Sequence, residues 1–237
     1  MIARPLIFGY WNSDDHAPIS TMITAWRQAF PDFRIVGDGD VRPLLKEHDP
    51  DVVSLYDAIR LPSCKSDVAR FAMLYETGGF YVDCHVGLRS AAAVKKYLKD
   101  LSKYELIVFD RYGAPDGRIV QIVNGFLFAR ARSPIIAKTL KQALANLKAQ
   151  HRAQLNDTHS PYDVWTMTGP GVLNEVITRR KLITGRKLLK PRYRGRVKVV
   201  PEVDAPVVRN IFRDYKGKGQ HWSQRQRTEP LFELADP

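Results

Sequence analysis

Two side chains that bind metal ions, a carboxylate and an imidazole, stand two residues apart at Asp83 and His85. They follow a Gly-Gly pair at 78–79 and an apolar segment that predicts a strand over 80–83. Because side chains alternate along a strand, Tyr81, Asp83 and His85 are expected to point the same way. Such a pair can hold one divalent cation with positions left for oxygen ligands, and the imidazole favours Mn²⁺ over Mg²⁺.

A second polar pair, Asp67 and Arg70, lies three residues apart in a segment whose spacing predicts a helix over 66–76. Taken singly, this pair also fits a surface ion pair, and Asp83 with His85 also fits an ordinary strand exit. The succession of helix, glycine turn and polar strand end favours one site built by these four side chains. The other side of the helix carries an apolar stripe that would pack on a sheet, made of Val68, Phe71, Ala72 and Tyr75.

The elements that must position these residues follow an α/β order. Residues 4–10 predict a strand, 17–30 a helix that stops at Pro31, and 33–36 a second strand closed by a turn at 37–40. This order indicates an α/β fold that begins with a parallel unit. Further helices are expected at 51–60, 134–150 and 171–180, further strands at 105–110, 122–128 and 197–200, a polar loop at 151–162 and an irregular tail from 216.

The segment from Ser66 to His85 resembles the DXD-motif sugar transferases. These include fungal outer-chain mannosyltransferases, bacterial capsular polysaccharide transferases and, more distantly, the glucosylating clostridial toxins. The matching residues are Ser66-Asp67 with Arg70, Leu74-Tyr75, Gly78-Gly79, and Tyr81-x-Asp83-x-His85. Sparser agreements occur at Tyr10-Trp11, at Trp26 and Pro31, at Asn124-Gly125 with Ala129 and Ser133-Pro134, at Thr168-Gly169-Pro170, and at His221-Trp222.

The resemblance implies a glycosyltransferase-A type α/β fold, with a mainly parallel central sheet flanked by helices. It implies one domain over 1–237, with a nucleotide-sugar-binding core at 1–130 and an acceptor side with a closing tail at 131–237. The expected reaction moves a sugar from a nucleotide sugar, UDP before GDP, to a glycan or lipid-linked acceptor with retention of configuration. Polysaccharide biosynthesis is the expected setting.

Site roles also follow from the resemblance. Asp67 and Arg70 are expected to contact hydroxyls of the donor sugar, and Asn124 to lie close to the transferred sugar. Asp83 would reach the ribose or the metal. The aromatic residues Trp11, Tyr81 and Trp222 would lie near the nucleotide, with Trp222 in a tail that closes over the donor.

His85 departs from the family pattern, which has a second acid at this position. An Asp-x-His version occurs in the polypeptide N-acetylgalactosaminyltransferases, where the histidine binds manganese. We therefore expect Asp83 and His85 to bind Mn²⁺, or Mg²⁺ in its place, with His221 as a further ligand. The loss of one negative charge leaves a second hypothesis, a degenerate homologue that binds nucleotide sugars without transfer.

The net charge of +12 is concentrated between Arg179 and Lys198, which hold ten basic residues and no acidic one. Such a stretch attracts polyanions, including a phosphorylated acceptor or an anionic membrane, and equally fits a solvated basic face. A nucleic-acid-binding protein is a less favoured alternative. The sequence lacks zinc-finger spacing and an RNA-binding aromatic signature, so nucleic acid is not expected as a partner.

No apolar run reaches the length of a membrane span, and the N-terminus lacks the pattern of a signal peptide. The two cysteines, Cys64 and Cys84, do not form a disulfide framework and are expected to be reduced. These features predict a cytoplasmic protein, with peripheral contact at the inner face of an anionic membrane as a further expectation.

Overall fold

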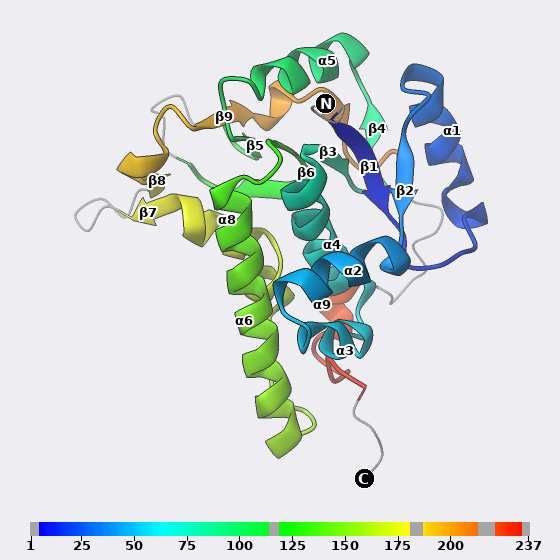
Figure 1. Cartoon of the computed structure of the whole chain (residues 1–237), viewed down its shortest axis with the longest axis vertical. Coiled ribbons are helices and arrows are strands. Elements are labelled where there is room, and N and C mark those ends of the chain that lie inside the picture. Colours follow the sequence, from blue (N-terminus) through cyan, green and yellow to red (C-terminus); the bar gives the residue numbers. More distant parts are fainter. Residues whose placement is uncertain (1–4, 114–118, 181–186, 213–220, 234–237) are drawn as a thin grey trace.

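The computed structural model describes residues 5–113, 119–180, 187–212 and 221–233, around a six-stranded sheet (Figure 1). Strand β1 pairs in parallel with β2 and β3, and β5 pairs in parallel with β9, whereas β6 runs antiparallel to both its neighbours. The mainly parallel sheet of the expected fold class is thereby confirmed. The strand order is β2 (Arg34–Val36), β1 (Leu6–Tyr10), β3 (Gly79–Val82), β6 (Ile122–Ala129), β5 (Leu106–Asp110) and β9 (Val197–Pro201).

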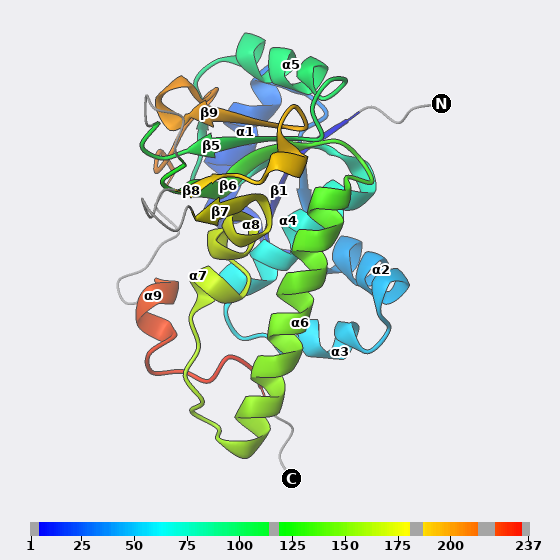
Figure 2. The same cartoon turned by 90° about the vertical axis from the view of Figure 1, so that its left-hand side faces the viewer.

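Helices cover both faces of the sheet, because side chains alternate between two cores along each strand. On β5, Leu106 and Val108 join one core, while Ile107 and Phe109 join the other. The second core lies under α1 (Ser20–Ala29) and α5 (Ala91–Asp100) (Figures 1 and 2). The first core lies under α2 (Asp38–His48), α3 (Val52–Asp57), α4 (Pro62–Thr77), α6 (Pro134–Asn156), α7 (Val164–Met167) and α8 (Pro170–Ile177).

Smaller elements complete the described chain. Antiparallel pairs form between β4 (Gly87–Leu88) and β10 (Val207–Val208), and between β7 (Thr178–Arg180) and β8 (Lys187–Leu189). Short 3₁₀ turns occur at Ala17–Ile19, Pro191–Tyr193 and Glu202–Asp204, and α9 covers Trp222–Arg225. Of the helices in the described segments, none is long and apolar enough to cross a membrane.

The Gly-Gly pair ends α4 and starts β3, as the sequence predicts. Gly78 adopts a φ of 63° and its N–H donates to the Leu74 carbonyl over 3.0 Å. Gly79 has a φ of 105°, and a Cβ there would lie 2.0 Å from the carbonyl oxygen of Leu6. Glycine at both positions therefore allows the helix to stop and the next strand to run directly against β1.

The turn predicted at 37–40 is wrong, because α2 begins there. Asp38 and Asp40 occupy its first turn, where carboxylates face the positive end of the helix dipole. The Gly37 N–H donates to Asp40 Oδ2 over 3.0 Å, which fixes the start of the helix. Pro43 lies inside α2, and because proline is unfavourable in a helix interior, the local sequence does not predict a helix here.

Two predicted boundaries are also wrong. The helix expected over 171–180 ends at Ile177, because Thr178–Arg180 pairs as a strand with Lys187–Leu189. Helix α6 continues to Asn156, inside the expected polar loop. Its last turns are held by Gln154, which exchanges two hydrogen bonds with the backbone of Phe232. Phe232 is distant in sequence from Gln154, so local composition does not reveal this contact.

Candidate active site

Arg70 joins polar residues from three elements at the edge of the sheet where β3 ends and β6 begins. Its Nη2 lies 3.1 Å from Asp67 Oδ1 and 3.2 Å from Asp83 Oδ1. Its Nη1 donates to the backbone carbonyl of Asn124 over 2.6 Å. Four residues singled out in the sequence are therefore in contact. The Arg70 side chain is only 4% exposed, so the alternative of a surface ion pair is wrong.

Asp67 is fully engaged by protein groups. Its Oδ1 accepts the side-chain amide of Asn124 over 2.9 Å, and its Oδ2 accepts the hydroxyl of Thr168 over 3.0 Å. Burial raises the pKa of Asp67 to about 6, although Arg70 and the hydrogen bond from Thr168 act in the opposite direction. In the structure, Asp67 links α4 to β6 and to the end of α7 through these hydrogen bonds. The contact of Asp67 with sugar hydroxyls remains a prediction.

The buried hydroxyl of Tyr81 orients the carboxylate of Asp83. Its hydroxyl lies 2.6 Å from Asp83 Oδ1 and 2.8 Å from the hydroxyl of Ser66. The Arg70 guanidinium carbon stands 4.6 Å from the centre of the Tyr81 ring, which is 1% exposed. Burial raises the pKa of Tyr81 well above its ordinary value, so the neutral phenol donates to Asp83. The expected packing of Tyr81 against a nucleoside remains a prediction.

Asp83 and His85 stand on a turn, and their predicted place on the strand is wrong. Strand β3 ends at Val82, and the Val86 N–H donates back to the Asp83 carbonyl over 3.0 Å. Asp83 Oδ2 lies 3.9 Å from His85 Nδ1, with side chains 22% and 17% exposed. Two metal–ligand bonds of about 2.1 Å each reach across up to about 4.2 Å, so one ion fits between these atoms.

Gly125 leaves the space that Asp83 occupies. The Asp83 N–H donates to the Gly125 carbonyl over 2.7 Å, which draws the two backbones together. A Cβ at Gly125 would lie 2.7 Å from Asp83 Oδ2, closer than such atoms can approach. The absence of a side chain at this position therefore allows the observed orientation of the carboxylate.

His221 is not part of a metal-binding group within the described residues. Among them, no set of three His, Cys, Asp or Glu side chains is arranged to hold a metal ion. His221 Nδ1 lies 2.7 Å from the Ser223 hydroxyl at the start of α9. Asp83 and His85 would thus hold an ion together with ligands from the substrate and from water. A role for His221 as a third ligand remains a prediction.

The two tryptophans expected near the nucleotide lie directly after β1 and at the start of α9. Trp11 directly follows β1, and its indole N–H donates to the Asp15 carbonyl over 2.9 Å. Trp222 is half-buried against the core under α4. Gln226, directly after α9, accepts the Val164 N–H over 3.0 Å and so links the tail to α7, whose following residue, Thr168, binds Asp67. Their contact with a nucleotide is untested.

A second buried cluster, not recognised in the sequence, lies beside the first. Asp38 accepts the hydroxyl of Tyr56 over 2.7 Å, the hydroxyl of Tyr10, and the Lys65 ammonium over 3.2 Å. Burial opposes ionisation of Asp38, but these three partners hold its pKa below the ordinary value. Since Tyr10 ends β1 and Lys65 lies next to Ser66, the cluster fixes the loop of Trp11 relative to α4.

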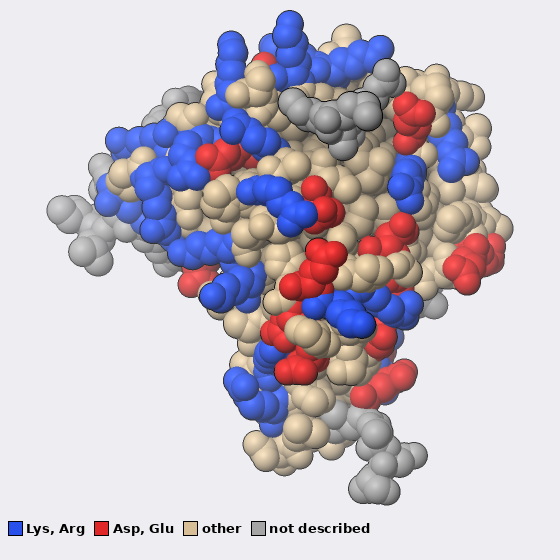
Figure 3. Space-filling view, in the orientation of Figure 1, with Lys and Arg blue, Asp and Glu red and all other residues tan. Residues whose placement is uncertain are grey.

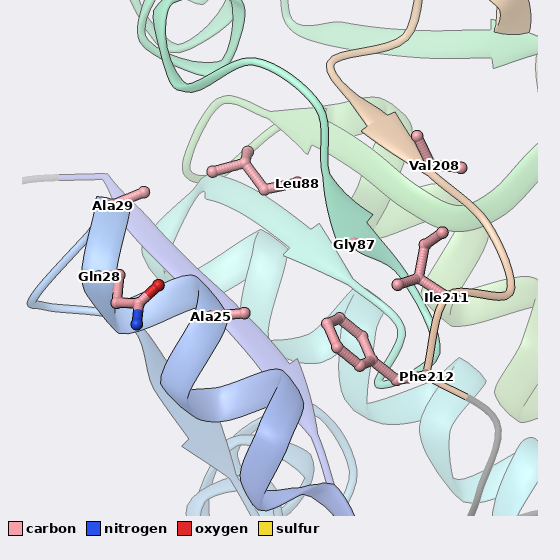
Figure 4. Close-up of a pocket in the computed structure, with 8 residues that line it drawn as sticks. All are labelled: Ala25, Gln28, Ala29, Gly87, Leu88, Val208, Ile211 and Phe212. Carbon is pink, nitrogen blue, oxygen red and sulfur yellow. The ribbon is translucent and has the colours of Figure 1, made fainter.

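An apolar pocket of about 450 Å³ lies between α1 and the β4–β10 pair (Figure 4). It borders the turn that carries Asp83 and His85. Its wall includes Ile211 and Phe212, whose N–H groups donate to the His85 carbonyl over 3.0 and 3.4 Å. These bonds anchor the turn of Asp83 and His85 through the His85 carbonyl. The full lining is Ala25, Gln28, Ala29, Gly87, Leu88, Val208, Ile211 and Phe212.

Residues 19–105 match the glycosyltransferase sugar-binding region containing the DXD motif. This part of the chain is therefore the sugar-binding region of a DXD-motif glycosyltransferase. The matched residues contain Asp67, Arg70, Tyr81, Asp83 and His85, so the family expected from the motif spacing is confirmed. No curated protein sequence matches the glycosyltransferase.

Solved structures similar to this chain include two glycosyltransferases. One is the PaToxG glycosyltransferase, with 16% identity, a TM-score of 0.46, and coverage of 74% of this chain and 68% of that one. Another is the UDP-bound glycosyltransferase domain from the YGT toxin, with 11% identity, a TM-score of 0.43, and coverage of 84% and 58%. The glycosyltransferase described here thus spans little more than half of the latter chain, and at these TM-scores neither likeness assigns its substrate.

Proposed function

We propose that this glycosyltransferase moves a hexosyl group from a nucleoside diphosphate sugar, UDP in preference to GDP, to a glycan or lipid-linked acceptor. The proposed reaction retains the anomeric configuration and uses Mn²⁺, or Mg²⁺ in its place. The observation that carries the proposal is the convergence on Arg70 of Asp67, Asp83 and Asn124, with the second oxygen of Asp83 facing His85.

The donor set at the motif fits a divalent cation. Asp83 Oδ2 and His85 Nδ1 provide one hard and one borderline ligand, and a mixed oxygen and nitrogen set suits manganese better than magnesium. When bound, the cation supplies Lewis-acid stabilisation of the charge that grows on the departing diphosphate. Arg70 and Tyr81 hold Asp83 Oδ1 and so leave Oδ2 for this purpose.

Neither acid joined to Arg70 is placed as a covalent nucleophile. Asp67 uses both oxygens in hydrogen bonds, and Asp83 is committed to Arg70 and Tyr81 through one of its two. We therefore propose attack by the acceptor hydroxyl on the face from which the diphosphate leaves. The bond from the anomeric carbon to the phosphate oxygen breaks with its electron pair, the acceptor oxygen forms the new bond, and its proton passes to the departing phosphate.

The two halves expected from the resemblance are proposed as the donor side, 1–130, and the acceptor side with its tail, 131–237. Most residues of the candidate site come from the first half. Thr168 of the second half reaches Asp67, so the site is completed from both. A cytoplasmic location, contact with the inner face of a membrane and a part in polysaccharide biosynthesis belong to the same proposal.

Thermal denaturation with nucleotide sugars, with and without Mn²⁺, tests the proposal, because a ligand that binds only the folded chain raises the melting temperature. The expected result is a metal-dependent rise with UDP-sugars, accompanied by hydrolysis of the same donor. Binding without hydrolysis or transfer would favour the degenerate homologue. The absence of any nucleotide-dependent shift would contradict the proposal.

A further inference from the structure

The later part of the basic stretch, residues 192–198, lies at the edge of the sheet opposite the candidate active site, whereas the Lys187 carbonyl accepts the Ile119 N–H beside the start of β6. Asp83 and Asn124 stand where β3 ends and β6 begins, and β5 ends at that same edge because Asp110 pairs with Ile122. Strand β9 starts beside the start of β5, and Arg194 precedes it. The two edges are one strand apart, about 17 Å for five residues at about 3.3 Å each.

These residues join others from α5 and α6 in a continuous surface, which we call the basic face. Lys96 and Lys103 surround Asp100, which pairs with Lys198 over 2.8 Å, and Arg196 pairs with Glu105 over 2.6 Å. The basic face comprises Lys96, Lys103, Arg130, Lys138, Lys190, Arg192, Arg194, Arg196 and Lys198, with the acids Asp100, Glu105 and Glu175. Of the basic stretch, Lys181 and Arg186 lie outside the described residues.

Positive charge exceeds negative charge on this face. Lys and Arg crowd the upper left and the top of the surface in Figure 3, over β9, β8 and α5, whereas Asp and Glu gather lower down. Lys138, Arg192 and Arg194 are exposed. Burial, and then the charges of Arg192 and Lys138, lower the pKa of Lys190. Such crowding of like charge is relieved when a polyanion binds.

The chemistry of the face favours lipid headgroups over nucleic acid. Its tyrosine rings are covered by cations: Arg192 lies 4.9 Å from the ring of Tyr193, and Lys198 lies 5.1 Å from the ring of Tyr97. Both rings are buried, so they are not offered to bases, which single-stranded nucleic acid would stack on exposed aromatics. Binding to an anionic membrane surface requires only a broad set of Lys and Arg side chains.

We propose that the basic face docks the glycosyltransferase onto an anionic lipid surface. The charges act at a distance from Asp83 and Asn124, so they anchor the protein and do not bind the acceptor's phosphates at the site. With this face on the membrane, the edge that carries the motif is turned away from the lipid headgroups, so of the two proposed acceptors this orientation favours the glycan. A water-soluble donor then reaches the site while the protein stays bound. The docking does not depend on the proposed reaction.

Vesicle flotation tests this proposal with phosphatidylcholine vesicles that contain or lack phosphatidylglycerol. The test variant is Arg192→Glu with Arg194→Glu. The matched control, Lys46→Glu with Arg152→Glu, makes the same change in net charge at exposed positions on α2 and α6. The wild type and the control should float only with the anionic vesicles. The test variant should lose more than about tenfold in apparent affinity, because each basic residue near the surface adds to the attraction.

Three results would overturn the proposal: equal binding by the test variant and the control, equal binding to neutral vesicles, or no flotation of the wild type. The basic face would instead be a nucleic-acid surface if the wild type did not float but bound RNA and single-stranded DNA on filters, and the test variant lost this binding. Lys96→Glu with Lys103→Glu provides a second variant from another element. Donor hydrolysis in solution should be unchanged in both variants, which separates failure of docking from failure of the proposed reaction.

Discussion

Asp83 meets Arg70 through one carboxylate oxygen, with 3.2 Å between Oδ1 and Nη2, and this contact decides where its other oxygen points. The hydroxyl of Tyr81 donates to the same Oδ1 over 2.6 Å. Oδ2 is left facing His85 at 3.9 Å. The protein thus aligns the motif acid with two buried donors before any substrate binds, which is the preorganisation that a catalytic site requires.

Tyr81→Phe removes one of these donors and should weaken metal-dependent nucleotide binding. A hydrogen bond to a charged group contributes roughly 1.5–3 kcal/mol, so we expect the affinity for UDP with Mn²⁺ to fall at least about tenfold. Isothermal titration calorimetry measures this change. Tyr97→Phe, at a buried tyrosine in the core on the other face, serves as the control and should bind UDP as the wild type does. Equal affinities in both variants would contradict the alignment of Asp83 by Tyr81.

Gly125→Ala should displace the carboxylate of Asp83 by a steric clash. The added Cβ would lie 2.7 Å from Asp83 Oδ2, so the carboxylate must leave the position in which this oxygen faces His85. We expect donor hydrolysis to fall by at least about tenfold, the usual cost of disturbing the support of a metal site. Gly39→Ala is the matched control, because its Cβ would meet nothing within 4 Å. Wild-type hydrolysis by Gly125→Ala would show that this orientation of Asp83 is not required.

Asp67 should make folding stability depend on pH in an unusual direction. Its pKa is raised to about 6 by burial and is about 3.9 in the unfolded chain, so the folded state binds more protons between these values. The contribution of Asp67 to stability therefore grows as pH falls from 7 to 5, by about 1 kcal/mol. Urea unfolding at both pH values should show the wild type gaining this amount relative to Asp67→Asn. Parallel changes in the two proteins would contradict the raised pKa.

The sequence was sufficient to predict the part of the site that is local. Asp67 and Arg70 lie on one helix, Tyr81 lies on the strand after the glycine turn, and Asp83 directly follows that strand. Their periodicities place them at one edge of the sheet. The strand reading failed only beyond Val82, where the Val86 N–H bonds to the Asp83 carbonyl and turns the chain. Period-two spacing does not distinguish a strand end from such a turn.

The rest of the site depends on contacts between residues far apart in the chain. Thr168 lies about a hundred positions from Asp67 and binds it only because α7 packs near the start of α4. The Asp38 cluster forms because Asp38 lies in the first turn of α2, a helix that the sequence does not predict because of Pro43. The opposition of residues 192–198 to the motif follows from the antiparallel placement of β6 between β3 and β5 and from the parallel pairing of β9 with β5, and strand pairing is not visible in any single segment.

The most direct test of the central claim is calorimetric titration of UDP into the wild type, His85→Ala and His85→Asp, each with and without Mn²⁺. His85→Ala removes one of the two ligands that the structure places 3.9 Å apart, and His85→Asp restores a second ligand of the family's type. We predict that Mn²⁺ strengthens UDP binding in the wild type and in His85→Asp, and that this enhancement falls at least about tenfold in His85→Ala. An undiminished Mn²⁺ enhancement in His85→Ala would contradict the assignment of Asp83 and His85 as the metal-binding pair.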